Sequence, residues 1–268
     1  MTADIDPGAY LDRIGLAAVP APTESELVRL HAAHALTIPF ENLDIHLGRG
    51  IDPSPGAVFD KLVRNRKGGF CFEQNSLLYG MLDGLGFTVR RLMGRVTFNA
   101  TAPRPRTHLI NLVEIGERSW IADVGFGVYG FVEPVPFEID RVHEAGDEAY
   151  RIVAAAGTTG FEMQARVEGD WRGLYWFSLD PCYDADVVMG SFYHSNYPHS
   201  PFVQERIVGL PGRGVRRTLL NGEFKIREGR ALTVRTLTDE AEYRSVLEAE
   251  FGIVLPADAR LKPLPGLA

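Results

Sequence analysis

Apolar side chains recur at helical spacing over the first part of the chain. In residues 25–36 they return every three or four positions, Thr23 is a candidate N-cap, and Pro39 ends the pattern because it removes a backbone donor. A further run, residues 77–85, repeats at i, i+1, i+4, i+5 and i+8, which is one face of a helix. The pattern predicts a helical N-terminal region that ends near residue 88.

The pattern changes over residues 88–180. Short runs rich in β-branched and aromatic residues follow one another, and Gly, Pro, Asn and Asp separate them. This spacing predicts an antiparallel sheet or a small barrel. Nearer the C-terminus, Asn221-Gly222 between two such runs predicts a hairpin, and residues 238–253 have helical spacing behind Thr238 as N-cap. We therefore expect a helical part, then a β part, then a small α/β part.

The composition is that of a folded globular protein. Hydrophobic residues make up 45% of the 268 residues and charged residues 24%, which is enough apolar material for a core. The net charge of −7 argues against nucleic acid or an anionic membrane as the main partner. No apolar run approaches the ~20 residues of a membrane-spanning helix, and the N-terminus lacks a signal-peptide pattern. We expect a cytoplasmic protein.

Two cysteines occur, Cys71 and Cys182, which excludes a disulfide-stapled scaffold and a zinc site built on cysteine pairs. Cys71 would open a helix directly after Gly68-Gly69, and the free N–H groups of a helix N-terminus favour the reactive thiolate. The alternative is a buried core cysteine, because free cysteines are among the most buried residues. Cys182 has no basic neighbour and is interpreted as inert.

His108 and Asp123 offer that thiol a base and an orienting carboxylate. They lie on two strand-like runs joined by a short polar turn. A turn of two or four residues places Asp123 opposite residue 110 or 108, so both side chains share one face, whereas a one-residue slip would separate them. Alone, His108 reads as a structural histidine. Together with Cys71, the three residues form the arrangement of a cysteine nucleophile activated by a His-Asp pair.

The other histidines give weaker signals. His31 and His34 are i, i+3 on one helix with no matching third ligand, so we interpret them as part of a solvated helix face and expect no metal site. His194 and His199 lie in an aromatic loop, residues 191–202, where they either line a pocket or belong to the plain surface.

The segment KGGFCFEQN, residues 67–75, resembles the active-site signature of the arylamine N-acetyltransferases, in which Arg-Gly-Gly-Phe/Tyr-Cys-Phe-Glu is typical. Further segments similar to that family occur in its order over nearly the whole chain. They are YLDRIG at 10–15, IPFENLD at 38–44, residues 107–127 and residues 191–202.

The resemblance implies a Cys71-His108-Asp123 triad. It implies acetyl transfer from acetyl-CoA to the nitrogen of arylamines or arylhydrazines by a ping-pong reaction through an acetyl-cysteine. Acetyl-CoA is then a co-substrate, with no tightly bound cofactor, and we expect a monomer or a weak homo-oligomer. The implied fold is α+β: a helical bundle (1–88), an antiparallel β-barrel (89–190) and an α/β lid (191–268), with the triad between the first two.

The resemblance also implies pocket residues, each of which has ordinary core packing as its alternative. The matching positions are Phe40, Val96, Phe126, Gly127 and Phe202. Gly125, Gly127 and Gly130 would let the pantetheine arm of the donor pass close to the backbone.

Two charged residues match positions of the family pattern, and two segments depart from it. Arg13 and Glu41 are expected to form a structural ion pair. Lys67 stands where the family usually has Arg, which keeps the charge but loses the planar fork. SNYPHS at 195–200 replaces the common Ser-Thr-x-Pro-x-Ser, which puts the acceptor preference in question.

Three other interpretations remain open. Amide synthases of antibiotic biosynthesis resemble the same family and join a longer acyl chain to an aromatic amine, so activity with acetyl-CoA would separate the two. Cysteine proteases and transglutaminases use Cys, His and Asp in the same chain order, but the FEN, VGFG and SPF segments have no role there. A non-catalytic Cys71 would not react with a thiol reagent in the folded protein.

Overall fold

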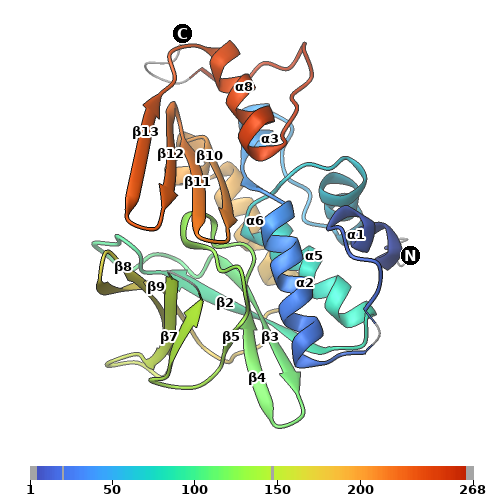
Figure 1. The fold of residues 1–268 in the computed structure, drawn as a ribbon, viewed down its shortest axis with the longest axis vertical. Helices are drawn as coiled ribbons and strands as arrows, with labels where there is room; N and C mark the ends of the chain where they lie inside the picture. The colour runs from blue at the N-terminus through green and yellow to red at the C-terminus, as the bar shows by residue number, and fades with distance from the viewer. Residues whose placement is uncertain (1–4, 20, 146–147, 264–268) are drawn as a thin grey trace.

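The computed structural model describes residues 5–19, 21–145 and 148–263. They fold into an α+β structure in which one nearly closed antiparallel sheet has helices along one side and a smaller sheet above it (Figure 1). Within these ranges no helix combines the length and the apolar character that crossing a membrane requires.

Helical segments make up the N-terminal part, as the spacing of apolar residues predicts. They are α1 (Pro7–Arg13), α2 (Glu24–Thr37), α3 (Leu43–His46), α4 (Pro55–Phe59), the π-helical turn η1 (Asp60–Arg64) and α5 (Cys71–Gly84). The hydroxyl of Thr23 accepts the Glu26 N–H and so caps α2, which confirms the predicted N-cap. The apolar faces of these helices share one core with Val113 and Trp120 of the large sheet.

The large sheet has the strand order β5-β4-β3-β2-β9-β8-β7-β6, and every pairing in it is antiparallel. Its strands are β2 (Thr88–Val96), β3 (His108–Ile115), β4 (Arg118–Ala122), β5 (Val135–Pro136), β6 (Val142–Ala145), β7 (Glu148–Ala154), β8 (Phe161–Val167) and β9 (Asp170–Phe177). A 3-10 turn, η2 (Gly127–Tyr129), lies between β4 and β5. The curled sheet encloses a second apolar core.

Alternation along β3 and β4 decides which way the candidate site residues face. On β3, Ile110 belongs to the barrel core and Val113 to the helical core. His108 shares the parity of Ile110, so its side chain lies on the barrel side. Ile121 of β4 is also in the barrel core, and Asp123 continues its face.

The pairing register confirms the predicted hairpin. Ile115 pairs with Arg118 across a two-residue turn, and Asn111 pairs with Ala122. This is one of the two turn lengths that keep His108 and Asp123 on one face.

The C-terminal part contains a five-stranded sheet of order β1-β10-β11-β12-β13. Its elements are β1 (Phe40–Glu41), β10 (Ile207–Gly212), β11 (Val215–Leu220), β12 (Glu223–Glu228), β13 (Ala231–Thr236), and the helices α6 (Asp184–Asn196), α7 (Pro201–Gln204) and α8 (Glu240–Phe251). Helix α8 packs on this sheet and forms a third core with it. Because Phe40 pairs with Gly209, β1 of the N-terminal part forms one edge of the C-terminal sheet.

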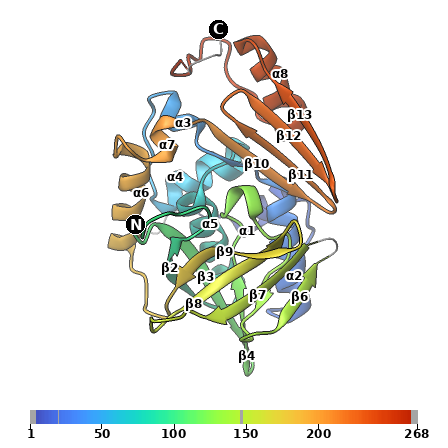
Figure 2. The ribbon, with the colours of Figure 1, turned by 90° about the vertical axis from the view of Figure 1, so that its left-hand side faces the viewer.

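Details of the C-terminal part both confirm and correct the expectations. Asn221 has φ 54° in the predicted turn between β11 and β12. The N-cap of α8 is Asp239 and not Thr238, because the Asp239 carboxylate accepts the Glu242 N–H. Residues 191–202 are not one loop, since α6 continues to Asn196 and runs beside α5 along one edge of the molecule (Figure 2).

Candidate active site

Cys71 is the first residue of α5 and is only 3% exposed. The chain enters this helix through Gly68, where an added Cβ would lie 2.2 Å from the Pro39 carbonyl oxygen, so only glycine allows the approach. This entry turn brings the start of α5 against the strand β1. The thiol Sγ lies 3.8 Å from the carbonyl oxygen of Thr107, the residue before His108.

His108 and Asp123 are paired beside this thiol. His108 Nε2 lies 2.7 Å from Asp123 Oδ2, and both side chains are closed to solvent. Because Nε2 is occupied by the carboxylate, the other ring nitrogen is the one left for the thiol. The structure therefore brings together Cys71, His108 and Asp123, the three residues that the sequence selects.

The second oxygen of Asp123 is satisfied by groups that sequence reasoning missed. Asn75 Nδ2 lies 2.8 Å from Asp123 Oδ1, and the Gly125 N–H donates to the same oxygen at 2.9 Å. Asn75 also binds the Leu109 carbonyl and accepts the Val124 N–H, so it ties α5 to both sides of the hairpin. Its spacing was the available signal, because a residue four positions after a helical nucleophile lies on the same helix face.

Burial and charge oppose each other in this pair. Burial alone would raise the pKa of Asp123, but the His108 charge and three hydrogen bonds outweigh it and hold that pKa below its usual value. Burial likewise acts to lower the pKa of His108, yet the Asp123 charge and the neighbouring Cys71 thiol raise it to about 10. The imidazolium form of His108 is therefore favoured next to the thiol.

Two aromatic rings hold the imidazole from the barrel side. The Phe126 ring meets it edge-on at 5.3 Å, and the Tyr175 ring lies 4.8 Å away. Phe126 is one of the expected pocket residues, whereas nothing in the alternation of β9 singles out Tyr175. Val96, another expected pocket residue, is half-buried and pairs with Tyr175 across the sheet.

An aromatic wall shares one apolar cluster with Cys71. Phe202 contacts Phe40 at 6.0 Å, Phe70 at 5.5 Å and His194 at 4.5 Å between ring centres. Gly127 has φ 74°, and a Cβ there would lie 3.2 Å from the Phe40 ring, so a larger residue would press on this wall. The wall offers a flat apolar surface next to the reactive atom.

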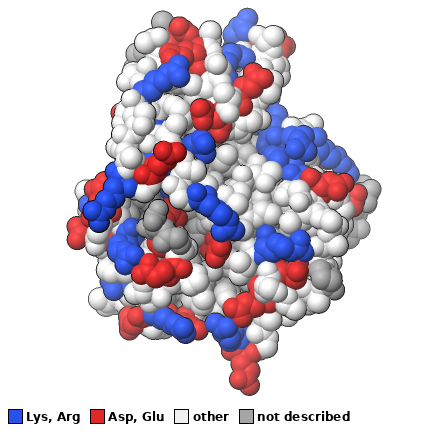
Figure 3. Space-filling view, in the orientation of Figure 1, with Lys and Arg blue, Asp and Glu red and all other residues white. Residues whose placement is uncertain are grey.

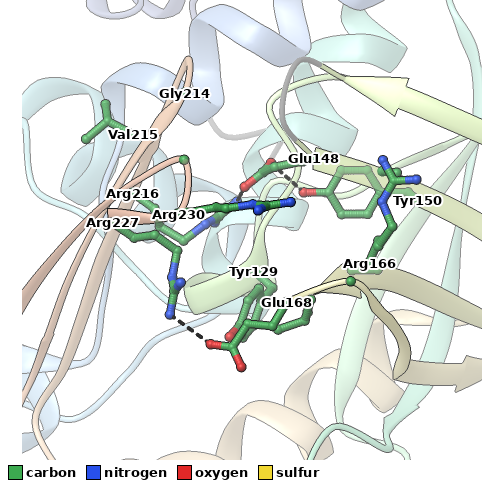
Figure 4. Close-up of a pocket in the computed structure, with 15 residues that line it drawn as sticks. Tyr129, Glu148, Tyr150, Arg166, Glu168, Gly214, Val215, Arg216, Arg227 and Arg230 are labelled. Carbon is green, nitrogen blue, oxygen red and sulfur yellow. Dashed lines mark hydrogen bonds and ion pairs between the residues drawn. The ribbon is translucent and has the colours of Figure 1, made fainter. Parts of the chain in front are cut away.

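A separate cavity of about 1000 Å³ lies between the barrel strands β7 and β8 and the ends of strands of the C-terminal sheet. Arginine side chains line it from both sides, namely Arg166, Arg216, Arg227 and Arg230 (Figure 4). Glutamates pair with the first three, and acidic and basic side chains stand side by side over this face of the molecule (Figure 3). Among the described residues, Arg230 has no acidic partner. Sequence periodicity does not reveal this cavity, since its arginines come from β8, β11, β12 and the turn after β12.

Comparison with known proteins decides the family. The model of a family described as N-acetyltransferase matches residues 25–260. Arylamine N-acetyltransferase of Escherichia coli strain K12 is 38% identical over 248 residues, which cover 91% of this chain and 87% of that protein. The chain belongs to the arylamine N-acetyltransferase family.

Solved structures of arylamine N-acetyltransferases have the same fold. The enzyme from M. tuberculosis matches with a TM-score of 0.89 and 34% identity over 92% of this chain and 94% of that one. The enzyme from Mycobacterium marinum, in a structure in complex with CoA, matches with a TM-score of 0.87 and 34% identity over 92% and 93%. The α+β class expected from the resemblance is confirmed.

The FEN segment, residues 40–42, joins the N-terminal part to the aromatic wall. Asn42 Nδ2 lies 2.8 Å from the Phe202 carbonyl and 2.7 Å from the Glu205 carbonyl. Its side-chain oxygen accepts the Ile207 N–H at 2.8 Å. One buried amide therefore fixes the segment that carries Phe202, whose ring contacts that of Phe40.

The expectation of an ion pair between Arg13 and Glu41 is wrong. Arg13 donates instead to the backbone oxygens of Leu62 and Arg66. Glu41 faces Lys61, whose ammonium lies 2.8 Å from Glu73, 3.2 Å from Asp44 and 3.6 Å from Glu41. Lys61 is the closer cation, and its side chain is only 12% exposed.

Lys61 stabilises the start of α5 through Glu73. The second oxygen of Glu73 accepts the Phe70 N–H, the free donor directly before Cys71. Lys67 lies at the edge of this cluster, where its ammonium is 3.4 Å from Asp44.

The solvated helix face expected for His31 and His34 is also wrong. Both side chains are fully buried because each ring nitrogen finds a partner in the core. Of the two later histidines, His194 is buried and its Nε2 lies 2.8 Å from the Thr107 carbonyl, whereas His199 is exposed.

Replacing Lys61 tests the charge cluster. Lys61→Met removes the cation that faces Glu41 and Glu73, while Asp44 keeps Lys67 and Arg49, each at 3.4 Å. Because two buried carboxylates lose their cation, we expect the free energy of unfolding to fall by about 3–5 kcal/mol in chemical denaturation. Lys67→Met is the matched control and is expected to cost under about 1 kcal/mol, because its side chain is 32% exposed.

The stability loss in Lys61→Met should also depend on pH. Burial raises the pKa of Glu73 to about 7 even with Lys61 beside it. The charged form of Glu73 is thus the one that Lys61 supports. The loss in Lys61→Met should be largest above pH 7 and should shrink as the pH falls and Glu73 takes up its proton. An equal loss for both lysine variants at every pH would contradict the assignment.

Proposed function

We propose that the chain transfers the acetyl group of acetyl-CoA to the nitrogen of arylamines and arylhydrazines through an acetyl thioester on Cys71. The observation that carries the proposal is the 2.7 Å contact between His108 Nε2 and Asp123 Oδ2 beside that thiol. Relatives with this fold are named arylamine N-acetyltransferases, and one of them is in complex with CoA.

The first half-reaction acylates the cysteine. His108 holds the thiol proton while the Cys71 sulfur attacks the thioester carbonyl of the donor. A bond forms between the Cys71 sulfur and the acetyl carbon, the bond to the CoA sulfur breaks, and the imidazolium returns the proton to the departing thiolate. Asp123 stabilises the imidazolium throughout, in the way that a carboxylate supports the histidine of a hydrolase triad.

The second half-reaction transfers the acetyl group. The nitrogen of the acceptor attacks the acetyl carbon, His108 takes its proton, and Cys71 leaves as thiolate. A thioester suits this step because it stays reactive toward a weakly basic aromatic nitrogen. We place the flat acceptor against Phe40, Phe126 and Phe202, which surround the thiol and the imidazole.

We place the phosphates of the donor in the arginine-lined cavity. Guanidinium groups bind phosphate oxygens by charge-assisted hydrogen bonds, and four of them gather there. A smaller cavity of about 230 Å³ shares Tyr129, Arg216 and Arg227 with it and reaches Ile207, which packs against the apolar cluster around Cys71. We infer that the donor runs through both cavities, from the phosphates toward the thiol.

The two cysteines provide a direct test of the nucleophile. In Cys71→Ala we expect the rate of CoA release with an arylamine acceptor to fall about ten-thousand-fold, because no thioester can form. Cys182→Ala is the matched control, since Cys182 is also buried but its pKa is raised to about 11 by burial, and it should keep the wild-type rate. Near wild-type activity in Cys71→Ala would sink the proposal.

Two exposed arginines test the placement of the phosphates. Arg230→Ala should raise the KM for acetyl-CoA about tenfold or more, because one charge-assisted hydrogen bond is worth about 1.5–3 kcal/mol. The KM for an acetyl-pantetheine thioester without the nucleotide should not change. Arg235→Ala, at a nearby exposed arginine that pairs with Glu242, is the control and should leave both constants unchanged. An unaltered KM for acetyl-CoA in Arg230→Ala would place the phosphates elsewhere.

A further inference from the structure

His31 lies on α2 directly behind Asp123 and is fully buried. Its Nε2 lies 3.1 Å from the backbone nitrogen of Asp123, and its Nδ1 lies 3.0 Å from the backbone oxygen of Val132. A backbone N–H can only donate, so Nε2 must be the unprotonated nitrogen. The ring is then neutral and carries its hydrogen on Nδ1, which donates to Val132. Burial, which lowers the pKa of His31, favours the same neutral form.

One imidazole thereby joins the two ends of the segment from Asp123 to Val132. Between these ends lie Phe126, whose ring meets His108, and Tyr129, which lines the arginine cavity. The same segment therefore carries the proposed catalytic carboxylate, an aromatic contact of the proposed base and one wall of the proposed donor site. His31 itself touches no substrate position.

We propose that His31 is a positioning residue of the reaction, which holds Asp123 at one ring nitrogen and the donor side of the loop at the other. The inference rests on the proposed function for its consequences. It goes beyond that function because it gives His31, a residue outside the triad, two separate effects. Nε2 positions Asp123, and Nδ1 positions the donor side of the loop.

His34 provides the matched control. It lies one turn further along the same helix and is equally buried. Its nitrogens face the Tyr10 hydroxyl at 3.0 Å and the Gln74 side-chain oxygen at 2.7 Å, and neither contact involves the segment from Asp123 to Val132. A general loss of core packing would affect variants of both histidines alike.

Glutamine and asparagine separate the two halves of the contact. The side-chain oxygen of His31→Gln can reach the place of Nε2 and accept the Asp123 N–H, while the bond to Val132 is lost. The side-chain amide of His31→Asn can occupy the place of Nδ1 and donate to Val132, while the Asp123 N–H loses its acceptor.

The decisive experiment measures Cys71 alkylation by iodoacetamide across pH, together with kcat and KM for acetyl-CoA. For His31→Asn we expect alkylation at neutral pH and kcat to fall tenfold or more. For His31→Gln we expect alkylation within about threefold of wild type and a KM for acetyl-CoA raised severalfold. His34→Gln should lower the melting temperature alone. If His31→Asn does not fold, the split between alkylation and KM in His31→Gln decides alone.

Two outcomes would overturn the inference. One is that the His31 variants lose stability as His34→Gln does, with wild-type alkylation and kinetic constants. The other is that His31→Asn and His31→Gln change Cys71 alkylation and the KM for acetyl-CoA to the same extent. Alkylation needs no acetyl-CoA, so it reports on the positioning of the site even if Cys71 is never acetylated. Failure of the proposed function is thus distinguishable from failure of this inference.

Discussion

The 2.7 Å hydrogen bond between His108 and Asp123 is the contact on which the rest of the site depends. A buried carboxylate without partners is costly, so the fold has to bring donors to both of its oxygens. They come from three places: Asn75 on α5, the Gly125 N–H after β4, and His108 on β3. Because each donor belongs to a different part of the fold, satisfying one carboxylate also sets α5, the barrel hairpin and the glycine-rich segment after β4 relative to one another.

A second buried charge cluster holds the opposite side of the same helix. Lys61 balances Glu41, Asp44 and Glu73, and Glu73 in turn caps the backbone just before Cys71. Cys71 is therefore positioned from two directions: by the cluster at the helix start and by Asn75 one turn further on. In both clusters, burying charged groups costs desolvation free energy, and this cost is offset only when the hydrogen bonds and ion pairs have the right geometry. The buried polar groups of α5 therefore favour a single position of the helix.

The sequence could predict the His108–Asp123 hairpin because strand periodicity and a short turn leave few registers. It could also have reached Asn75 by its i+4 spacing from Cys71. The Arg13–Glu41 pair failed because charge alone does not say which cation lies nearest, and Lys61 takes that place. His31 was misjudged because its partner Val132 is 101 residues away, beyond what local periodicity can show. The arginine cavity was missed for a similar reason, since its lining comes from strands that meet only in the folded chain.

The most direct test of the central claim is rapid-quench mass spectrometry of the protein mixed with acetyl-CoA and no acceptor. One acetyl group should appear on the Cys71 peptide of the wild type at the first time points. In Asp123→Asn, which keeps the shape but not the charge, the same peptide should be acetylated at least about a hundredfold more slowly. Acetylation of Asp123→Asn at the wild-type rate, or an acetyl group on any other residue, would contradict the account.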